Sequence, residues 1–367
     1  MRAWPIGRPF FLETRLNMKK LLLLAAATAA LAAGAAHAQE PAALNLYSAR
    51  HYASDEQLYD GFTQATGIKI NRVDADDAGI IARLKAEGSA SPADVILLVD
   101  AARLWRGEHD GLFQPVRSKL LDEAIPASLR AQPAADGGIP WFGFSTRARV
   151  IVYDKVRVQP ADVASYADLG DARNKGKLCI RSGSHPYNLS LFGAQLEHMG
   201  PEKTEAWLKG MVANMARAPK GGDTDQIKAV AAGECQIAVT NSYYLARLMR
   251  SAKPEDRQVA EKVGVVFPNQ ASWGTHVNIA GAAVARHAKH PGNAVRFLEY
   301  LASPAAQNYF ANGNNEWPVA KGVVTDNPAL KAMTGGSGSF KAETIPVGKV
   351  GEHQVQVQQM LDRVGFK

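Results

Sequence analysis

The chain has 367 residues, of which 46% are hydrophobic and 21% are charged, so it can bury a large core and form two lobes. Its formal net charge is +7, but the first 38 residues hold five basic side chains and one acidic side chain, which leaves +3 on the remainder. This low charge, without a polybasic run or interleaved basic and aromatic residues, argues against a protein that binds nucleic acid.

The N-terminal residues 1–38 have the pattern of a secretory signal peptide. Two lysines precede an apolar stretch that is short for a membrane span, and small residues stand at the expected cleavage site, after Ala38. Met18, just before the lysines, is a second candidate for the initiating methionine. No later stretch is apolar enough to span a bilayer, and no cysteine stands at the cleavage site to carry a lipid. We therefore expect a soluble protein of the periplasm.

The segments that follow alternate between strand and helix patterns, an order typical of parallel sheets with helical crossovers. The helix expected at 54–67 has Ser54 and Gln57 at capping-box spacing and Gly67 as its stop. A longer apolar strand at 141–154 is predicted to cross between two lobes. The other expected strands are 44–49, 69–73, 93–99, 176–182, 235–242 and 276–285. The other expected helices are 78–88, 187–200, 204–215, 223–234, 292–312 (broken at Pro304) and 352–364.

This order of segments predicts an α/β protein with two lobes, each a mostly parallel sheet flanked by helices. Residues 39–140 are expected to form the first part of lobe 1, and residues 141–272 to form lobe 2. Residues 273–325 would return to lobe 1. The C-terminal helical segment 326–367 would pack on lobe 2.

The sequence holds two cysteines, Cys179 and Cys235, which in an oxidising compartment are candidates for a disulfide. Each lies eight residues before a tyrosine, so two similar strand-to-loop units would lie side by side if the cysteines were joined. Closing this loop would stabilise the fold by about 4 kcal/mol in the chain-entropy model. The alternative is a pair of buried thiols.

Two adjacent tyrosines, Tyr243 and Tyr244, stand where a predicted strand ends and a helix begins. In a strand they would point to opposite faces, whereas in the first turn of a helix both can lean toward one crevice. Tyr187 follows another predicted strand, and His51 and Tyr52 follow the first strand. Ligands of open α/β sheets bind at the carboxyl ends of strands, so these side chains are candidates for one site.

Phenols could serve at such a site as metal ligands. The ordinary pKa of tyrosine is about 10, so a phenolate at neutral pH needs a highly charged cation beside it. Hard cations prefer anionic oxygen, whereas zinc or copper would prefer imidazole and thiolate, so several phenols with one histidine indicate ferric iron. Taken singly, each tyrosine could instead be an amphipathic residue at the core's edge, and His51 a capping or surface residue.

Several segments together carry a resemblance to a known family: YSARHY, RSGSHPYN, DQIKAVAAGE, VTNSYYLARL and WGTHVNIAGAAVARHAKHPGNAVRFLEYL. In this order, from about residue 44 to 320, they resemble the periplasmic ferric-ion-binding proteins, the substrate-binding components of iron ABC transporters. The resemblance implies a hinged, two-lobed fold of the periplasmic binding type (type II-like) that closes over one ferric ion. It further implies a monomeric transport protein, not an enzyme, that passes Fe³⁺ to an inner-membrane ABC permease.

The resemblance also implies the ligands, position by position. Tyr243 and Tyr244 match the family's tyrosine pair, and Tyr187 matches its third tyrosine. Tyr52, with His51 beside it, matches the ligand that a tyrosine-rich subgroup adds from the first lobe. Other members use a histidine with a glutamate, or fill this position with a synergistic anion such as carbonate. Whether His51 touches the metal or only supports Tyr52 is left open.

Three further residues are candidates for holding such an anion or for balancing a fourth phenolate. Arg147 stands in the predicted crossover strand, and Arg103 and Ser184 are weaker candidates of the same kind. The alternative for Arg147 is a salt bridge near the hinge, and for Ser184 an ordinary turn. Asp76 and Asp77 stand where the family's glutamate would be sought, and we expect them at the surface or as helix caps.

Two rival functions remain open on the sequence alone. The same fold could bind an oxyanion, a polyamine or another small ligand, and such a protein would give no colour with iron. A secreted hydrolase could use Ser184 and His185, but adjacent residues are a poor geometry for a nucleophile and its base.

Overall fold

The computed structural model describes residues 43–50, 52 and 54–367, which belong to one compact unit. The predicted signal peptide, its cleavage site and His51 lie outside the described residues. None of the helices within the described part of the chain is long and apolar enough to cross a membrane.

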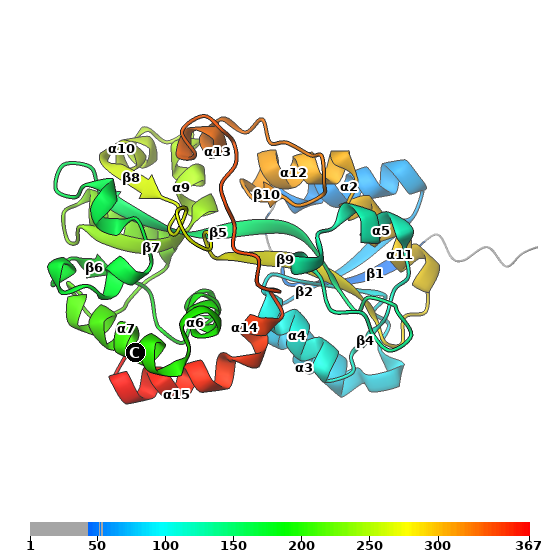
Figure 1. The fold of residues 1–367 in the computed structure, drawn as a ribbon. Helices are drawn as coiled ribbons and strands as arrows, with labels where there is room; N and C mark the ends of the chain where they lie inside the picture. Colours follow the sequence, from blue (N-terminus) through cyan, green and yellow to red (C-terminus); the bar gives the residue numbers. More distant parts are fainter. Residues whose placement is uncertain (1–42, 51, 53) are drawn as a thin grey trace, which may run out of the picture. The chain divides into compact units, whose positions relative to one another are not determined.

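A first group of strands forms one end of the sheet, and its order is β2-β1-β3-β9 (Figure 1). The pairs β1–β2 and β1–β3 are parallel, whereas β9 runs antiparallel to β3. The elements of this group are β1 Ala43–Ser48, α2 Asp55–Thr66, β2 Lys69–Asp74, α3 Asp77–Glu87, β3 Val95–Leu98, α4 Ala101–His109, β4 Phe113–Gln114, α5 Lys119–Ala124, β9 Val277–Ala285, α11 Pro291–Leu301 and α12 Pro304–Asn314.

A second group of strands lies beyond β5, in the order β5-β7-β6, with β8 also paired to β5. The short pair β6–β7 is parallel, so the carboxyl ends of both strands lie at one edge. The elements of this group are β6 Leu178–Cys179, α6 Pro186–Met199, α7 Pro201–Asn214, α8 Asp223–Ala231, β7 Ile237–Asn241, α9 Ser242–Met249, α10 Pro254–Lys262 and β8 Val263–Val266.

The long strand β5 (Phe142–Asp154) belongs to both groups and runs beside β9 in Figure 1. Its residues up to Ala148 pair with β9, and from Arg149 onward it pairs with β7 and β8. In the second half, Val150 and Val152 pack into one hydrophobic cluster and Ile151 into another. Because alternate residues of a strand point to opposite faces, both faces of this half are covered, which explains the unbroken apolar run in the sequence.

The remaining strand and α-helices form the C-terminal part of the chain. They are β10 Trp317–Pro318, α13 Pro328–Met333, α14 Lys349–Glu352 and α15 Gln354–Val364. Helix α15 packs on α6 and α7 of the second group, whereas α14 contacts both α6 and α4. A side chain at Gly351 of α14 would meet the Trp105 ring of α4 at 2.8 Å, so only glycine allows this approach. The C-terminal segment therefore touches both groups.

Two details differ from the sequence predictions. Among the strands of the described residues, the parallel pairs are β1–β2, β1–β3 and β6–β7, and the strands that pair with β5 and β9 are antiparallel, so the sheet is mixed. The capping box predicted at Ser54 is wrong, because the Ser54 side chain makes no cap bond. Its hydroxyl donates instead to Asn314 Oδ1 at 2.8 Å, a partner that is 260 residues away in the sequence.

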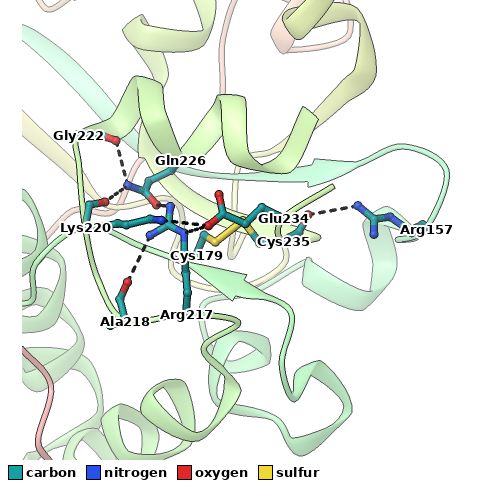
Figure 2. The surroundings of a disulfide bond; sticks show 9 residues. All are labelled: Arg157, Cys179, Arg217, Ala218, Lys220, Gly222, Gln226, Glu234 and Cys235. Carbon is teal, nitrogen blue, oxygen red and sulfur yellow. Dashed lines mark hydrogen bonds and ion pairs between the residues drawn. A yellow bond between two sulfur atoms is a disulfide. The ribbon is translucent and has the colours of Figure 1, made fainter. Parts of the chain in front are cut away.

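The two cysteines are joined in the structure by a disulfide between β6 and the segment that precedes β7 (Figure 2). Their Cα atoms are 5.9 Å apart, and both residues are buried. The carbonyl oxygen of Cys235 also accepts a hydrogen bond from the Arg157 guanidinium at 3.3 Å. The bridge therefore fastens β6, which has only two residues, to its neighbour β7.

Replacing both cysteines by alanine is expected to lower the free energy of unfolding by about 4 kcal/mol, because the bridge closes a long loop in the unfolded chain. Chemical denaturation of the wild type with and without a strong reductant measures this difference. The double variant is the control, since the reductant should not shift its unfolding midpoint. An unchanged wild-type midpoint after full reduction would contradict the prediction.

Candidate metal centre

Tyr187 lies in the first turn of α6. The helix begins here because Pro186 occupies its first position and His185 caps it, with His185 Nδ1 accepting a hydrogen bond from the Tyr187 backbone N–H at 3.2 Å. Burial, and next the charges of Arg181 and Arg149, lower the pKa of His185 to about 4. The imidazole is therefore uncharged at neutral pH, so its Nδ1 can accept the hydrogen bond from the Tyr187 N–H.

Tyr243 and Tyr244 lie in the first turn of α9, directly after β7. Their ring centroids are 4.2 Å apart, and the rings are tilted by 30°. The hydroxyl groups of Tyr243 and Tyr187 are 3.2 Å apart and share a hydrogen bond. Because β6 and β7 are parallel neighbours, the two helices that follow them start at the same edge of the sheet, which brings these tyrosines together.

Tyr52 follows β1 and is hydrogen-bonded to Tyr243. The Tyr243 phenol therefore interacts with Tyr187, which belongs to the second group of elements, and with Tyr52, which follows a strand of the first group. The electrostatic influence of Tyr244 reaches both Tyr187 and Tyr243. The structure thus brings together all four of the tyrosines predicted from the sequence. Their predicted neighbour His51 lies outside the described residues.

The surroundings of these phenols disfavour their charged form when no cation is present. Burial is the main cause that raises the pKa values of Tyr52, Tyr187 and Tyr243 above the ordinary value. Negative charge on one phenol raises the pKa of the next, as Tyr244 does for Tyr187. Several phenolates can coexist here only if a highly charged cation joins them.

Arg147 of β5 is buried beside this cluster, with 2% of its surface exposed. Its Nη1 donates to the Val99 carbonyl oxygen at 2.9 Å, while Nε and Nη2 have no hydrogen-bond partner among the described residues. Burial lowers the pKa of Arg147, but the negative charge of Glu316 and of three tyrosines (Tyr243, Tyr187 and Tyr52) more than offsets this. A permanent positive charge with two unused donors therefore faces the phenols.

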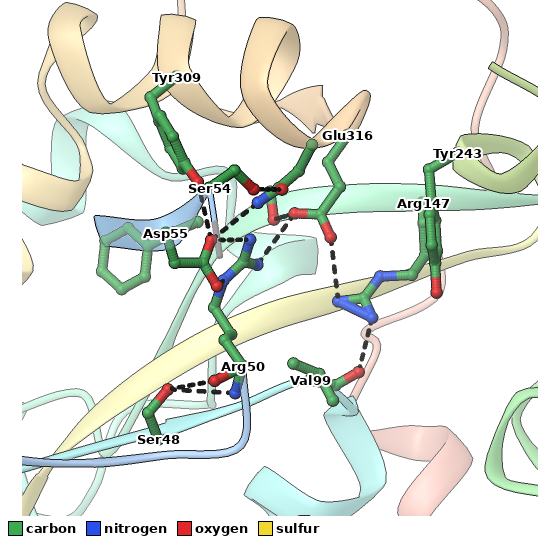
Figure 3. Close-up of polar contacts among 12 residues, drawn as sticks. Ser48, Arg50, Ser54, Asp55, Val99, Arg147, Tyr243, Tyr309 and Glu316 are labelled. Carbon is green, nitrogen blue, oxygen red and sulfur yellow. Dashed lines mark hydrogen bonds and ion pairs between the residues drawn. The ribbon is translucent and has the colours of Figure 1, made fainter. Parts of the chain in front are cut away.

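Glu316 links Arg147 to a second buried arginine (Figure 3). One of its oxygens lies 4.0 Å from Arg147 Nη2, and the other accepts hydrogen bonds from Arg50 at 3.0 Å and Ser145 at 2.6 Å. Arg50 in turn binds Asp55 through Nε and Nη2. The Arg50 guanidinium also lies 5.5 Å from the centroid of the Tyr52 ring. This network fixes the Arg50 side chain, two residues before Tyr52 in the sequence.

Arg247 of α9 is a third cation at the cluster, and the sequence interpretation missed it. Its guanidinium lies 5.4 Å from the ring centroid of Tyr52 and 5.7 Å from those of Tyr243 and Tyr244. The sequence does indicate that Arg247 lies near Tyr243, because it follows Tyr243 by four residues and residues at this spacing share one face of a helix.

The weaker candidates from the sequence have contacts with other groups than the tyrosines. The charge of Arg103 acts on Asp77 and Asp100, and the Ser184 hydroxyl bonds with that of Ser182 at 3.1 Å. Asp76 caps α3, as expected, by accepting from the Gly79 N–H at 2.7 Å. Asp77 accepts from the Val99 N–H at 2.9 Å, and burial raises its pKa to about 6. In the described part of the chain, no group of three or more His, Cys, Asp or Glu side chains is placed to hold a metal ion.

Residues 57–334 match the family of bacterial extracellular solute-binding proteins. The chain is 44% identical over 324 residues to Iron uptake protein A1 of Synechocystis sp., covering 88% of this chain and 87% of the relative. It is 30% identical to the Fe(3+)-binding periplasmic protein of Serratia marcescens, covering 87% and 91%. The solved structure of Trichodesmium IdiA (FutA) in complex with iron and citrate ligands matches with 50% identity and a TM-score of 0.83, covering 89% of this chain and all of that one.

Proposed function

Because the chain belongs to the family of bacterial extracellular solute-binding proteins, we propose that it binds ferric iron in the periplasm and delivers it to an ABC permease in the inner membrane. The fold is the two-lobed α/β fold of periplasmic ferric-binding proteins. The observation that carries the proposal is the meeting of four tyrosines, from two parts of the chain, beside the buried cation of Arg147.

The donor set suits a small trivalent cation. Phenolate is a hard anionic oxygen ligand, and three phenolates would neutralise Fe³⁺ while a fourth would leave the site with one negative charge. Arg147 and Arg247 lie where they can balance that charge. The two unused donors of Arg147 could instead hold a synergistic anion such as carbonate. We propose Tyr52, Tyr187, Tyr243 and Tyr244 as the ligands.

The proposed ligands come from both lobes, so iron would favour the closed state. Tyr52 follows a strand of the first group, and the other three tyrosines belong to the second group. We propose that residues 39–140 and 273–325 form lobe 1 and that residues 141–272 form lobe 2. A ligand shifts such a hinge only through its higher affinity for one state, and an ion held by phenolates from both lobes has that preference. We expect a monomer that transports iron and catalyses no reaction.

A visible absorption titration of the metal-free protein with a weakly chelated ferric salt tests the proposal. We expect a phenolate-to-iron charge-transfer band that saturates at one iron per chain. Because phenols lose protons when they bind a metal, loading should release protons, and acid should weaken the band. A colourless titration would contradict the tyrosine–iron site and would favour a protein of the same fold that binds an oxyanion or a small organic ligand.

A further inference from the structure

A buried polar hub lies next to the tyrosines of the second group. Its centre is Asp223, in the first turn of α8, and it joins side chains from four other places in the chain. The Asp223 carboxylate accepts hydrogen bonds from Arg149 at 2.6 Å, from Arg181 at 3.2 Å and from the backbone N–H of Asn241 at 2.7 Å. Arg149 also donates to Asn188 Oδ1 at 2.6 Å. We call Arg149, Arg181, Asn188, Asp223 and Asn241 the Asp223 hub.

The hub joins the two turns that carry the proposed ligands. Asn188 directly follows Tyr187, and its side-chain N–H groups donate to the carbonyl oxygens of Arg181 at 3.1 Å and Ser182 at 3.0 Å. Asn241 is the N-cap residue of α9, so its backbone bond to Asp223 fixes the turn that holds the tyrosine pair. Tyr187 is thereby held relative to Tyr243 and Tyr244 by bonds that need no metal.

The hub also places positive charge on one ligand. It contains two guanidinium groups and one carboxylate, so it carries a net positive charge in a buried place. Both guanidinium groups lie over the Tyr187 ring, Arg181 at 5.1 Å and Arg149 at 5.9 Å from its centroid. A cation at this distance stabilises negative charge on the phenol through its ring and through space.

We propose that the Asp223 hub is a positioning unit that holds the three second-group tyrosines in ligand geometry before iron arrives, and that its Arg181 places a positive charge beside the Tyr187 ring when the metal is bound. This inference rests on the proposed ferric-iron site. Its residues act through the tyrosines and do not touch the metal. Groups that orient metal ligands from outside typically change the metal affinity by about 10–100-fold when they are removed.

The variant Arg181→Gln tests the hub, because Arg181 is its least buried charged member, with 15% of its side chain exposed. We expect the ferric affinity to fall by about 10–100-fold. We also expect the charge-transfer band to move to longer wavelength, since loss of the cation raises the energy of the phenolate electrons. The variant Arg181→Lys keeps the charge and should restore the position of the band. Purely structural damage would not move and then restore the band in this way.

The matched control is Arg217→Gln. Arg217 is similarly exposed, at 13%, and pairs at 2.8 Å with Glu234, which follows the C-terminal end of α8 near the disulfide (Figure 2). If Arg181→Gln binds iron with the same band and affinity as this control, the hub inference is wrong and the iron site stands. If the wild type itself gives no band, the proposed function fails, and the inference fails with it. The metal-free unfolding midpoints of both variants should agree within a few degrees.

Discussion

Replacing Tyr187 by phenylalanine is expected to abolish the retention of ferric iron, as is the double change Tyr243→Phe with Tyr244→Phe. Groups outside the ligand shell already change metal affinity by about 10–100-fold, so the loss of a direct phenolate should cost at least that much. The fold should survive, because each change removes hydroxyl groups only and costs about 1 kcal/mol per lost hydrogen bond. Competition with a chelator measures the affinity, and thermal unfolding without metal measures the stability.

Tyr300→Phe is the control for these variants. Tyr300 is a half-buried tyrosine of α11 whose ring packs against Phe62, with the ring centroids 5.5 Å apart, and it lies outside the proposed site. The Tyr300→Phe variant should bind ferric iron with the same affinity as the wild type. A Tyr187→Phe protein that held one ferric ion as tightly as this control would show that the proposed ligands are wrong.

Replacing Glu316 by glutamine is expected to cause a large loss of stability, about 3–5 kcal/mol in the free energy of unfolding. Its carboxylate is 1% exposed and pairs with Arg50 at 3.0 Å, while Arg147 lies 4.0 Å away. A neutral amide would leave two buried guanidinium groups with too little negative charge, and an uncompensated buried charge is costly. Equilibrium unfolding in urea measures the difference.

Glu123→Gln provides the comparison for Glu316. Glu123 pairs with Lys119 at 3.7 Å on the surface of α5, where the two side chains are 67% and 89% exposed. An exposed pair contributes about 0–1 kcal/mol, so this change should hardly shift the unfolding midpoint. Equal effects of the two substitutions would show that the buried network does not stabilise the fold as argued.

Much of the fold could be predicted from the sequence because its signals are local. The sequence predicts a stop at Gly67 for the helix at 54–67 and a break at Pro304 for 292–312. In the structure Gly67 is the C-cap of α2, and Pro304 is the first residue of α12. The capping box at Ser54 could not be judged this way, because the competing acceptor, Asn314, comes from a distant helix. The antiparallel neighbours of β5 were missed for a related reason, since pairing direction depends on contacts remote in sequence.

At the site, too, residues with a local sequence signal could be predicted, and residues defined by remote contacts could not. The tyrosine pair was found because two adjacent phenols at a strand end have a local meaning, and Arg147 because its strand was expected to cross between lobes. Glu316 and Asp223 were missed because their partners lie far away in the sequence, Arg50 by 266 residues and Arg149 by 74. The charges that balance a site can be recognised only after the chain is folded.

The change of partner along β5, from β9 to β7, has a consequence for domain motion. Arg147 still pairs with Asn278 of β9, whereas Arg149, two residues later, pairs with Asn241 of β7. A rotation of one lobe against the other would therefore pivot between these two arginines. Points near an axis of rotation move least, so the backbone at both arginines would stay almost still while β1, and Tyr52 after it, moves with the first lobe. The buried positive charge beside the proposed iron ligands would thus lie close to the axis of this rotation.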